Sequence, residues 1–315
     1  MNQHRFYKAA RDVPFEYIKS IGFGGVGTVD EVFGRDGSPF EGRIYARKTI
    51  LLVEDPAKRD EGLREIEKEV AILREASHHH IVKLVMTYLF QDNYGIVMDP
   101  RADGHLEKSL HENTPEVADK ISSWFGCLLS GVAYAHRRGI RHRDIKPHNI
   151  LVKDGTVLLS DFGISMMGIG ITVPTTFVGR PRARTLEYCA PEVEQGHTRG
   201  RSADVFSLGA VFLEMVTVCS YPGDSSSKLN ELHGALAVGG RHSYALSARG
   251  VGEWMNSLSD APSRPAWQPT VLEMCRRMLQ GERTSRPKMD DIWSWWSCQP
   301  LSDLPPMACS CGPST

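Results

Sequence analysis

Apolar and polar positions alternate along much of the first hundred residues, and this period-two pattern predicts a β-rich beginning. The stretches that carry it are residues 15–32, which hold a glycine cluster in their middle, 44–52, 82–90 and 94–98. Between them, residues 58–76 place Leu63, Ile66, Val70 and Leu73 at helical spacing with charges at the other positions. This segment is predicted to be one amphipathic helix packed on the strands.

The pattern changes after Asp99 to longer helical stretches joined by loops. The predicted helices are residues 124–138, 203–218, 269–279 and 288–296. Residues 220–264 are rich in Gly, Ser and short turns and give no clear element, and the chain beyond Pro300 is expected to be frayed. Strands followed by helices predict an α+β fold, with a boundary near residues 99–104.

Composition narrows the class of protein. The 315 residues carry 37 Lys and Arg against 38 Asp and Glu, a net charge of -1, and 41% are hydrophobic. This is the composition of an ordinary globular protein. It excludes a chain that is disordered throughout and a basic protein that coats nucleic acid without sequence specificity, so no nucleic-acid partner is expected.

No membrane span is expected either. The longest apolar-leaning run, residues 206–219, contains Glu214 and is shorter than the roughly 20 residues that a spanning helix needs. The first residues lack the apolar stretch of a secretory signal, and the seven cysteines show no zinc-site or redox pairing. We therefore expect reduced thiols and an intracellular location, cytoplasmic or nuclear.

The glycine cluster is the first candidate for chemistry. Residues 22–29 read GFGGVGTV, with glycines at Gly22, Gly24, Gly25 and Gly27, which lets backbone N–H groups approach phosphate oxygens closely. A dinucleotide-binding turn uses similar spacing but runs into a helix, whereas residues 28–32 continue as a strand. A strand-loop-strand phosphate cradle is therefore predicted.

A lysine in the next strand adds a cation to this cradle. Lys48 has apolar or small neighbours, so its charge needs a partner. The predicted helix offers two carboxylates, Glu65 and Glu69.

Three further motifs follow in order. Residues 142–149 read HRDIKPHN, 161–163 read DFG and 190–192 read APE. Behind a glycine loop and a strand lysine, this series resembles the eukaryotic protein kinase family over about residues 14–297. The late segments 204–209 (DVFSLG) and 284–287 (TSRP) also look like motifs of that family.

The resemblance implies a bilobal α+β fold and a domain division. The division is a β-rich N-lobe at residues 14–98, a hinge at 99–104, a mainly helical C-lobe at 105–298 and a flexible tail at 299–315. It also implies a buried ion pair between Glu192 and Arg286, which we expect to be structural.

The resemblance assigns roles in phosphoryl transfer, a reaction catalysed mainly by positioning and by cations. Asp144 would accept or align the hydroxyl proton, and Lys146 would reach the transferring phosphate. Lys48 would bind the α- and β-phosphates of ATP. Glu69 is the preferred partner of Lys48 because the stretch from 69 to 84 matches the family pattern, with Glu65 as the second choice.

The resemblance also implies how nucleotide and metal are held. Asn149 and Asp161 would bind Mg²⁺ through oxygen ligands. The residues that would line the adenine slot are Val29, Ala46, Leu151 and Met98, the last as gatekeeper. Backbone groups from Asp99 to Arg101 would bind the adenine edge, although Pro100 has no N–H to donate.

The predicted function is ATP- and Mg²⁺-dependent phosphorylation of Ser and Thr in protein substrates. Lys146 favours Ser/Thr over Tyr because kinases that modify tyrosine usually place Ala and Arg in this part of the loop. The alternative from a different class is a pseudokinase scaffold that binds nucleotide without catalysis. An upstream activating kinase is a further expected partner, with Thr175 or Thr176 as its hypothetical target.

Clustered histidines raise the question of a transition metal. Adjacent side chains in an irregular segment point in different directions, so we expect no metal site at the His78–His80 triplet. His136 and His148 have no ligand partner nearby in the sequence, and no site is expected there either.

Overall fold

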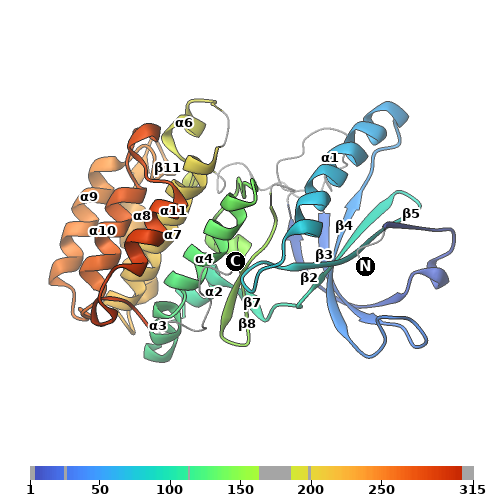
Figure 1. Ribbon diagram of the computed structural model, residues 1–315, viewed down its shortest axis with the longest axis horizontal. Helices are drawn as coiled ribbons and strands as arrows, with labels where there is room; N and C mark the ends of the chain where they lie inside the picture. The colour runs from blue at the N-terminus through green and yellow to red at the C-terminus, as the bar shows by residue number, and fades with distance from the viewer. Residues whose placement is uncertain (1–3, 25–26, 113, 163–185, 198–199, 307–315) are drawn as a thin grey trace. The chain divides into compact units, whose positions relative to one another are not determined.

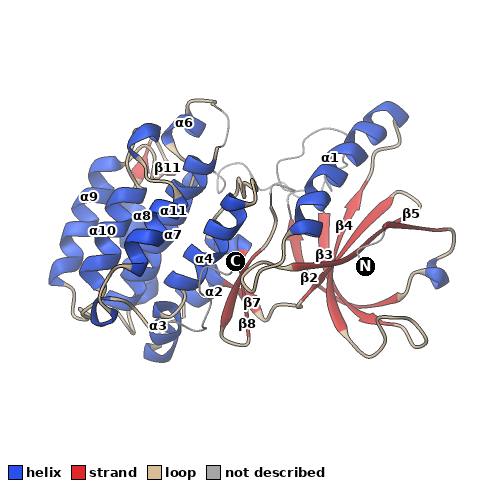
Figure 2. Ribbon diagram, in the orientation of Figure 1, coloured by secondary structure: helices blue, strands red, loops and turns tan. Residues whose placement is uncertain are grey.

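The computed structural model describes residues 4–24, 27–112, 114–162, 186–197 and 200–306. The chain divides into two compact units, one of residues 1–103 and 161–180 and the other of residues 104–160 and 181–315. Strands dominate the first unit and helices the second (Figure 2), which confirms the predicted α+β, bilobal class. The unit boundary after Asp103 falls inside the predicted hinge range.

A six-stranded sheet forms the first unit, with strand order β1-β5-β6-β4-β3-β2 (Figure 1). Its strands are β1 His4–Tyr7, β2 Phe15–Gly24, β3 Gly27–Gly34, β4 Ile44–Leu51, β5 Lys83–Phe90 and β6 Asn93–Asp99. The short 3-10 helix η1 spans Ala10–Asp12. All neighbours pair antiparallel except β1, which runs parallel to β5. The pattern did not predict β1, whose four residues are too few to show a period.

Helix α1, Pro56–Glu75, packs against β5. Asp55 caps it by accepting a hydrogen bond from the Lys58 N–H at 3.0 Å, and Pro56 occupies its first turn. Three of the four predicted stripe residues, Ile66, Val70 and Leu73, are fully buried. The helical period therefore identified both the element and the face that it buries.

The two faces of the sheet hold different residues. One face carries a compact apolar cluster, made of Val13, Phe15, Val32, Tyr45, Met86, Tyr88 and Val97. Because side chains alternate along a strand, the neighbours of these residues point to the other face, where the candidate site residues of this unit lie.

The second unit is mainly helical. Its helices are α2 Leu106–Leu110, α3 Pro115–Ser122, α4 Phe125–Arg137, α6 Pro191–Glu194, α7 Arg201–Ser220, α8 Ser225–Ala235, α9 Ala248–Ser257, α10 Gln268–Met278 and α11 Met289–Ser297. Its 3-10 helices are η2 Pro147–Asn149, η4 Leu258–Asp260, η5 Arg283–Ser285 and η6 Leu301–Asp303. Its strands are β7 Gly104–His105, β8 Ile150–Lys153 and β9 Thr156–Leu159 in one sheet, and β10 Ala237–Val238 and β11 Arg241–His242 in a hairpin.

The four long helices predicted in this unit are present within two residues as α4, α7, α10 and α11. Residues 220–264, which gave no clear pattern, contain α8, the β10–β11 hairpin, α9 and η4. Within the predicted flexible tail, η6 forms a turn and Pro305 is buried, while residues 307–315 lie outside the described residues. The flexibility of the tail stays a prediction.

Helix α7 is the core of the second unit, because every residue from Ala203 to Ser220 is buried. Among the described residues it is the one helix long and apolar enough to cross a membrane, and 94% of that apolar window is buried inside the protein. Burial on all sides is what a central core helix shows, and neighbouring helices cover α7 here.

A buried carboxylate on α7 collects three hydrogen bonds. Glu214 Oε1 accepts from the hydroxyls of Tyr188 at 2.8 Å and Tyr244 at 3.0 Å, and it lies 2.9 Å from His233 Nε2. Burial by itself lowers the pKa of His233, but the hydrogen bond and charge of Glu214, with the charge of Glu187, raise that pKa above its ordinary value. The protonated imidazole is therefore the form that the fold favours.

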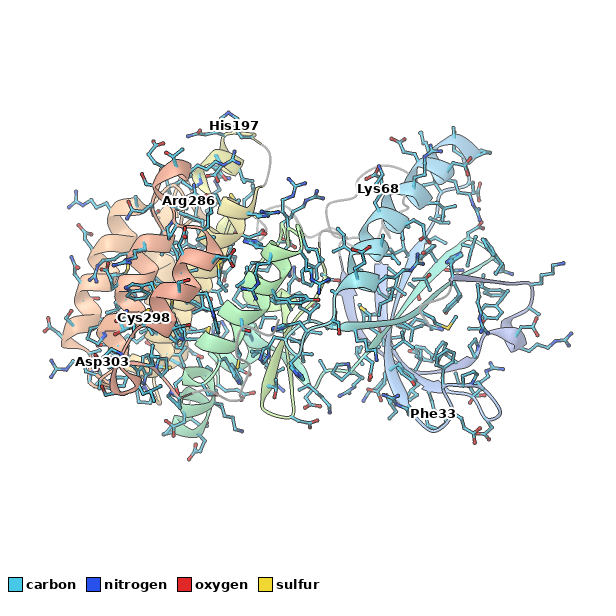
Figure 3. The ribbon with its side chains drawn as sticks, in the orientation of Figure 1. Phe33, Lys68, His197, Arg286, Cys298 and Asp303 are labelled. Carbon is cyan, nitrogen blue, oxygen red and sulfur yellow. The ribbon has the colours of Figure 1, made fainter. Side chains whose placement is uncertain are left out.

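The predicted ion pair between Glu192 and Arg286, the latter labelled in Figure 3, is confirmed. Arg286 Nη1 donates to Glu192 Oε1 at 2.9 Å and to the Ser202 carbonyl at 2.8 Å, while Nη2 donates to the second carboxylate oxygen. The guanidinium also lies over the ring of Phe206, 5.3 Å from its centroid. This geometry joins α6 to α7 and to the turn before α11.

Replacing Arg286 by Met should lower the free energy of unfolding by about 3–5 kcal/mol, because Glu192 would keep a buried charge without its partner. The matched control is Arg249→Met, which removes a solvent-exposed partner of Glu253 and should leave the unfolding curve unchanged. Urea denaturation of both variants measures the difference. Equal losses would contradict a structural role for the buried pair.

The His233–Glu214 pair should make stability depend on pH. Because the folded-state pKa of His233 is raised, its stabilisation is full below the unfolded-state pKa of about 6.5 and disappears as pH rises through the folded-state value. His233→Gln should therefore be most destabilising near pH 5.5 and least near pH 8.5, as measured by urea denaturation. A gap between wild type and variant that widens with rising pH would contradict this assignment.

Candidate active site

The glycine segment joins two paired strands. Strand β2 ends at Gly24 and β3 begins at Gly27, and the register pairs Gly24 with Gly27 and Gly22 with Val29. This confirms the strand-loop-strand prediction, although Gly25 lies outside the described residues. A Cβ atom added at Gly27 would stand 2.1 Å from the carbonyl oxygen of Thr49, so only glycine allows this close approach of β3 to β4.

Four predicted nucleotide residues share one face of the sheet. The register places Val29 opposite Lys48 and Ala46 opposite Met98, and directly paired residues point to the same side of a sheet. Ala46 and Lys48 are two apart on β4, so their side chains also share a side. The sheet therefore brings Val29, Ala46, Lys48 and Met98 together, on the face opposite the apolar cluster.

Lys48 forms an ion pair with Asp161. Its Nζ atom lies 2.7 Å from Asp161 Oδ1, the lysine side chain is 1% exposed, and the aspartate side chain is 27% exposed. Asp161 has a φ of 56°, a left-handed conformation that is uncommon for a residue other than glycine. The next residue, Phe162, is buried. The ammonium of Lys48 is thus buried against a carboxylate that keeps partial access to solvent.

The predicted helix partners of Lys48 have different outcomes. Glu69 lies on α1, but its side chain is outside the described residues, so its pairing with Lys48 stays a prediction. Glu65, the second choice, forms an exposed pair with Lys68 one turn along the same helix.

The side chains of the predicted hinge bind to neighbouring strands of the first unit. Arg43 Nη2 donates to Asp99 Oδ2 at 2.9 Å, and Arg101 Nε donates to Glu31 Oε2 at 2.5 Å. These ion pairs hold the Asp99–Arg101 segment against β3 and β4. Recognition of an adenine edge here would therefore fall to backbone groups, as the sequence resemblance implies.

In the second unit, the loop before β8 holds Asp144, Lys146 and Asn149. Lys146 Nζ and Asn149 Nδ2 each lie 2.8 Å from Asp144 Oδ2, and Asn149 Nδ2 also donates to the Asp144 carbonyl at 2.8 Å. Both hydrogens of the Asn149 amide are engaged in this way, so its Oδ1 atom is the one able to ligate a metal ion. Amide and carboxylate oxygens, as Asn149 and Asp161 supply, are the hard ligands that Mg²⁺ prefers.

Asp204, at the beginning of α7, binds the backbone of this loop through its carboxylate. Its Oδ2 accepts the N–H of His142 at 2.8 Å and lies 3.0 Å from His136 Nε2, and its Oδ1 accepts the N–H of Arg143 at 2.7 Å. Arg143 has a φ of 69°, and a conformation of this kind persists only where surrounding contacts hold it. The buried carboxylate therefore fixes the backbone just before Asp144.

Leu151 lies on β8, half-buried, where it pairs with Leu158 of β9 and His105 of β7. Asn149 also accepts hydrogen bonds at its carbonyl from the N–H and hydroxyl of Ser160, both at 3.0 Å. The loop is thus joined to the strand end that leads into Asp161.

A comparison with family models matches residues 15–295 to the protein kinase domain. The chain belongs to the protein kinase family. Members of this family generally use ATP and Mg²⁺, and their name implies protein substrates. Lys48, Asp144, Asn149 and Asp161, to which the sequence resemblance assigns roles, all lie within the matched range.

Curated relatives of this kinase chain agree on the family. It is 34% identical over 206 residues to the serine/threonine-protein kinase AtPK2/AtPK19 of Arabidopsis thaliana, a match that covers 64% of this chain and 41% of the relative. It is 35% identical over 211 residues to a probable cell division protein kinase of Encephalitozoon cuniculi, with 66% and 74% covered. The first of these matches thus spans about two fifths of that relative's length.

Sequence reasoning missed two features of this kinase. It named residues 204–209 as a family motif but gave Asp204 no role, because the backbone N–H groups that it binds are 61 and 62 residues away. It found no partner close in the sequence for His136 or His148, and so it could not name the partners that the fold supplies. His136 meets Asp204, and His148 lies beside His105 and Glu107, which the fold brings close from 41 or more residues away.

Asp204→Ala should lower the free energy of unfolding by at least about 2 kcal/mol, because it leaves the N–H groups of His142 and Arg143 buried without acceptors. The rate of phosphoryl transfer should fall in parallel, since the backbone before Asp144 loses its support. The control is Asp290→Ala, which removes an exposed partner of Arg137. Denaturation curves of the two variants that coincide would refute this role for Asp204.

Proposed function

We propose that this kinase transfers the γ-phosphoryl group of ATP to Ser and Thr hydroxyls of protein substrates. The observation that carries the proposal is the hydrogen-bonded arrangement of Asp144, Lys146 and Asn149. A carboxylate oxygen held by an ammonium and an amide keeps a fixed orientation, which a residue that aligns an incoming hydroxyl needs.

Asp144, Lys146 and Lys48 each have a separate role in the proposed reaction. Asp144 orients the acceptor hydroxyl and takes up its proton as the oxygen attacks phosphorus. Lys146, whose Nζ is already 2.8 Å from that carboxylate, offers a positive charge to the phosphoryl oxygens as they move toward the acceptor. Lys48, fully buried and paired with Asp161, binds the non-transferred phosphates.

Asn149 and Asp161 would hold Mg²⁺ through their side-chain oxygens. When bound, the ion neutralises charge on the triphosphate and helps the leaving oxygen depart. The apolar side chains of Val29, Ala46, Met98 and Leu151 would enclose the adenine ring, as the alternating register of β3, β4 and β6 supports for the first three.

The choice of Ser and Thr rests on Lys146 and on relatives named as serine/threonine-protein kinases. The five cysteines that the structure describes form no disulfide with one another, which is compatible with the proposed intracellular site of action, cytoplasmic or nuclear. Thr175 and Thr176, the hypothetical targets of an upstream kinase, lie outside the described residues, and their phosphorylation stays a prediction.

The proposal is tested with labelled ATP, Mg²⁺ and a generic Ser/Thr protein substrate. Asp144→Asn keeps the shape of the side chain but removes the proton acceptor, so kcat should fall by about 10² to 10⁴-fold. The control is Asp154→Asn, an exposed turn residue whose carboxylate lies 3.4 Å from Lys153 Nζ, and it should retain full activity. Phosphoamino-acid analysis of the product should find Ser and Thr.

Two results would defeat the proposal. In the first, wild type and Asp144→Asn incorporate the same amount of label. In the second, neither protein incorporates more label than a reaction without enzyme. Either result, with nucleotide binding intact, would favour the scaffold alternative.

A further inference from the structure

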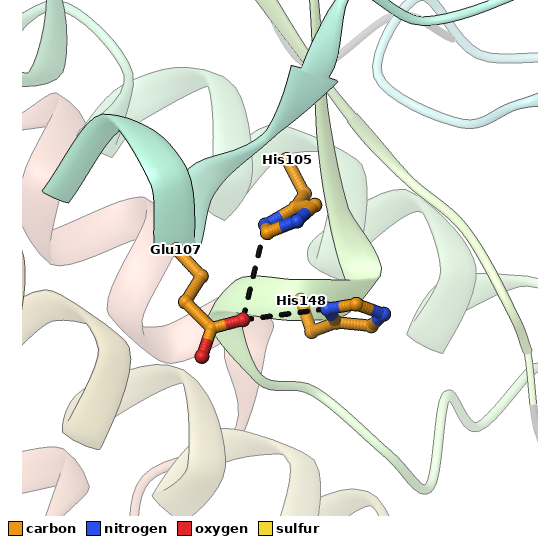
Figure 4. A group of neighbouring side chains, drawn as sticks. All are labelled: His105, Glu107 and His148. Atoms are coloured by element: carbon orange, nitrogen blue, oxygen red, sulfur yellow. Dashed lines mark hydrogen bonds and ion pairs between the residues drawn. The ribbon is translucent and has the colours of Figure 1, made fainter. Parts of the chain in front are cut away.

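Two histidines and a glutamate from separate segments meet beside the loop that carries Asn149. His105 comes from β7, Glu107 from the first turn of α2, and His148 from η2 (Figure 4). One ligand atom of each side chain lies within 4.8 Å of the other two. Among the described residues this is the one group of three such side chains so close together, and the proposed phosphoryl transfer makes no use of it.

The three side chains converge on a single carboxylate oxygen. Glu107 Oε2 lies 3.3 Å from His148 Nδ1 and 3.9 Å from His105 Nδ1, and the two imidazole rings stand 4.6 Å apart between centroids. In a tetrahedral site with metal–ligand bonds of about 2.0–2.1 Å, neighbouring ligand atoms are about 3.4 Å apart. The His148–Glu107 spacing already matches this value, the His105–Glu107 spacing exceeds it by about half an ångström, and the two imidazole ligand atoms lie within 4.8 Å of each other.

Backbone pairing holds the three segments in place. His105 pairs with Leu151 and Gly104 with Val152 across the β7–β8 ladder, and the Asn149 N–H donates to the Lys146 carbonyl at 3.0 Å inside η2. His105 is the N-cap residue of α2, yet its side chain does not cap the helix. The backbone therefore holds the three side chains near one another, and closing the site calls for changes in their side-chain torsions.

The types and exposure of the ligands favour zinc. Two imidazoles and one carboxylate form a common zinc donor set, and that set leaves the fourth position open for water. The side chains of His105, Glu107 and His148 are 34%, 33% and 52% exposed, although the Nδ1 atom of His105 is itself buried, so an ion would approach from the side of Glu107 and His148.

We propose that His105, Glu107 and His148 bind Zn²⁺. The ion would connect β7 and α2 to the loop of Asp144, Lys146 and Asn149, because His148 directly precedes Asn149 in η2. The inference does not depend on catalysis, since it rests on the ligand atoms alone. The competing occupant is a proton, which would make the group an ordinary imidazolium–carboxylate pair.

The test is zinc binding by the purified full chain, measured by competition with a chromophoric chelator. His105→Ala/His148→Ala should lose one equivalent of bound Zn²⁺, or weaken it by more than about 100-fold, because changes in outer partners alone cost 10 to 100-fold. The matched control is His79→Ala/His111→Ala, which removes two exposed histidines outside the group. It should bind like wild type.

Glu107→Gln provides a variant of nearly unchanged shape, so a folding defect cannot imitate a lost ligand. It should weaken zinc binding while its circular dichroism spectrum stays that of wild type. Zinc should also raise the Tm of wild type and of the control double variant, but not that of His105→Ala/His148→Ala. The proposal is overturned if wild type binds no zinc in the micromolar range, or if both double variants bind it equally.

Discussion

A buried carboxylate on the core helix is the constraint on which the catalytic loop depends. Asp204 stands at the beginning of α7, and its two oxygens receive the backbone N–H groups of His142 and Arg143. A buried charge is tolerated only when donors surround it, and here the donors are the residues that lead into Asp144. These hydrogen bonds attach the loop to a helix that is buried on all sides. They also hold Arg143, the residue of the loop with a left-handed backbone conformation.

Each unit contributes a different kind of positioning. In the first unit the antiparallel register alone places Val29, Ala46, Lys48 and Met98 on one face, which is the face proposed to bind the nucleotide. In the second unit side-chain hydrogen bonds orient Asp144 through Lys146 and Asn149. Phosphoryl transfer needs little covalent chemistry from the protein, and these contacts supply charge and orientation instead.

Periodicity predicted the elements that repeat a pattern for long enough. Helix α1 and the core helix α7 were found within two residues, whereas β1 and the hairpin β10–β11 are too short to show a period. The motif residues could be named because the sequence resembles the protein kinase family, whose motifs follow one another in this order. Sequence alone could not predict that Asp204 binds the loop, or that His148 lies beside His105 and Glu107. Tertiary folding brings these residues together, although they are far apart in the sequence. The pairing of Glu69 with Lys48 remains a prediction.

The central claim is that Asp144 and Asp161 belong to a working phosphotransferase that acts on Ser and Thr. Mass-spectrometric mapping of phosphorylation sites, after incubation of the purified chain and a protein substrate with ATP and Mg²⁺, tests it most directly. We expect phosphorylated Ser and Thr with the wild-type chain and none with Asp161→Ala, which lacks the carboxylate beside Lys48. The same sites at the same occupancy with both proteins would contradict it.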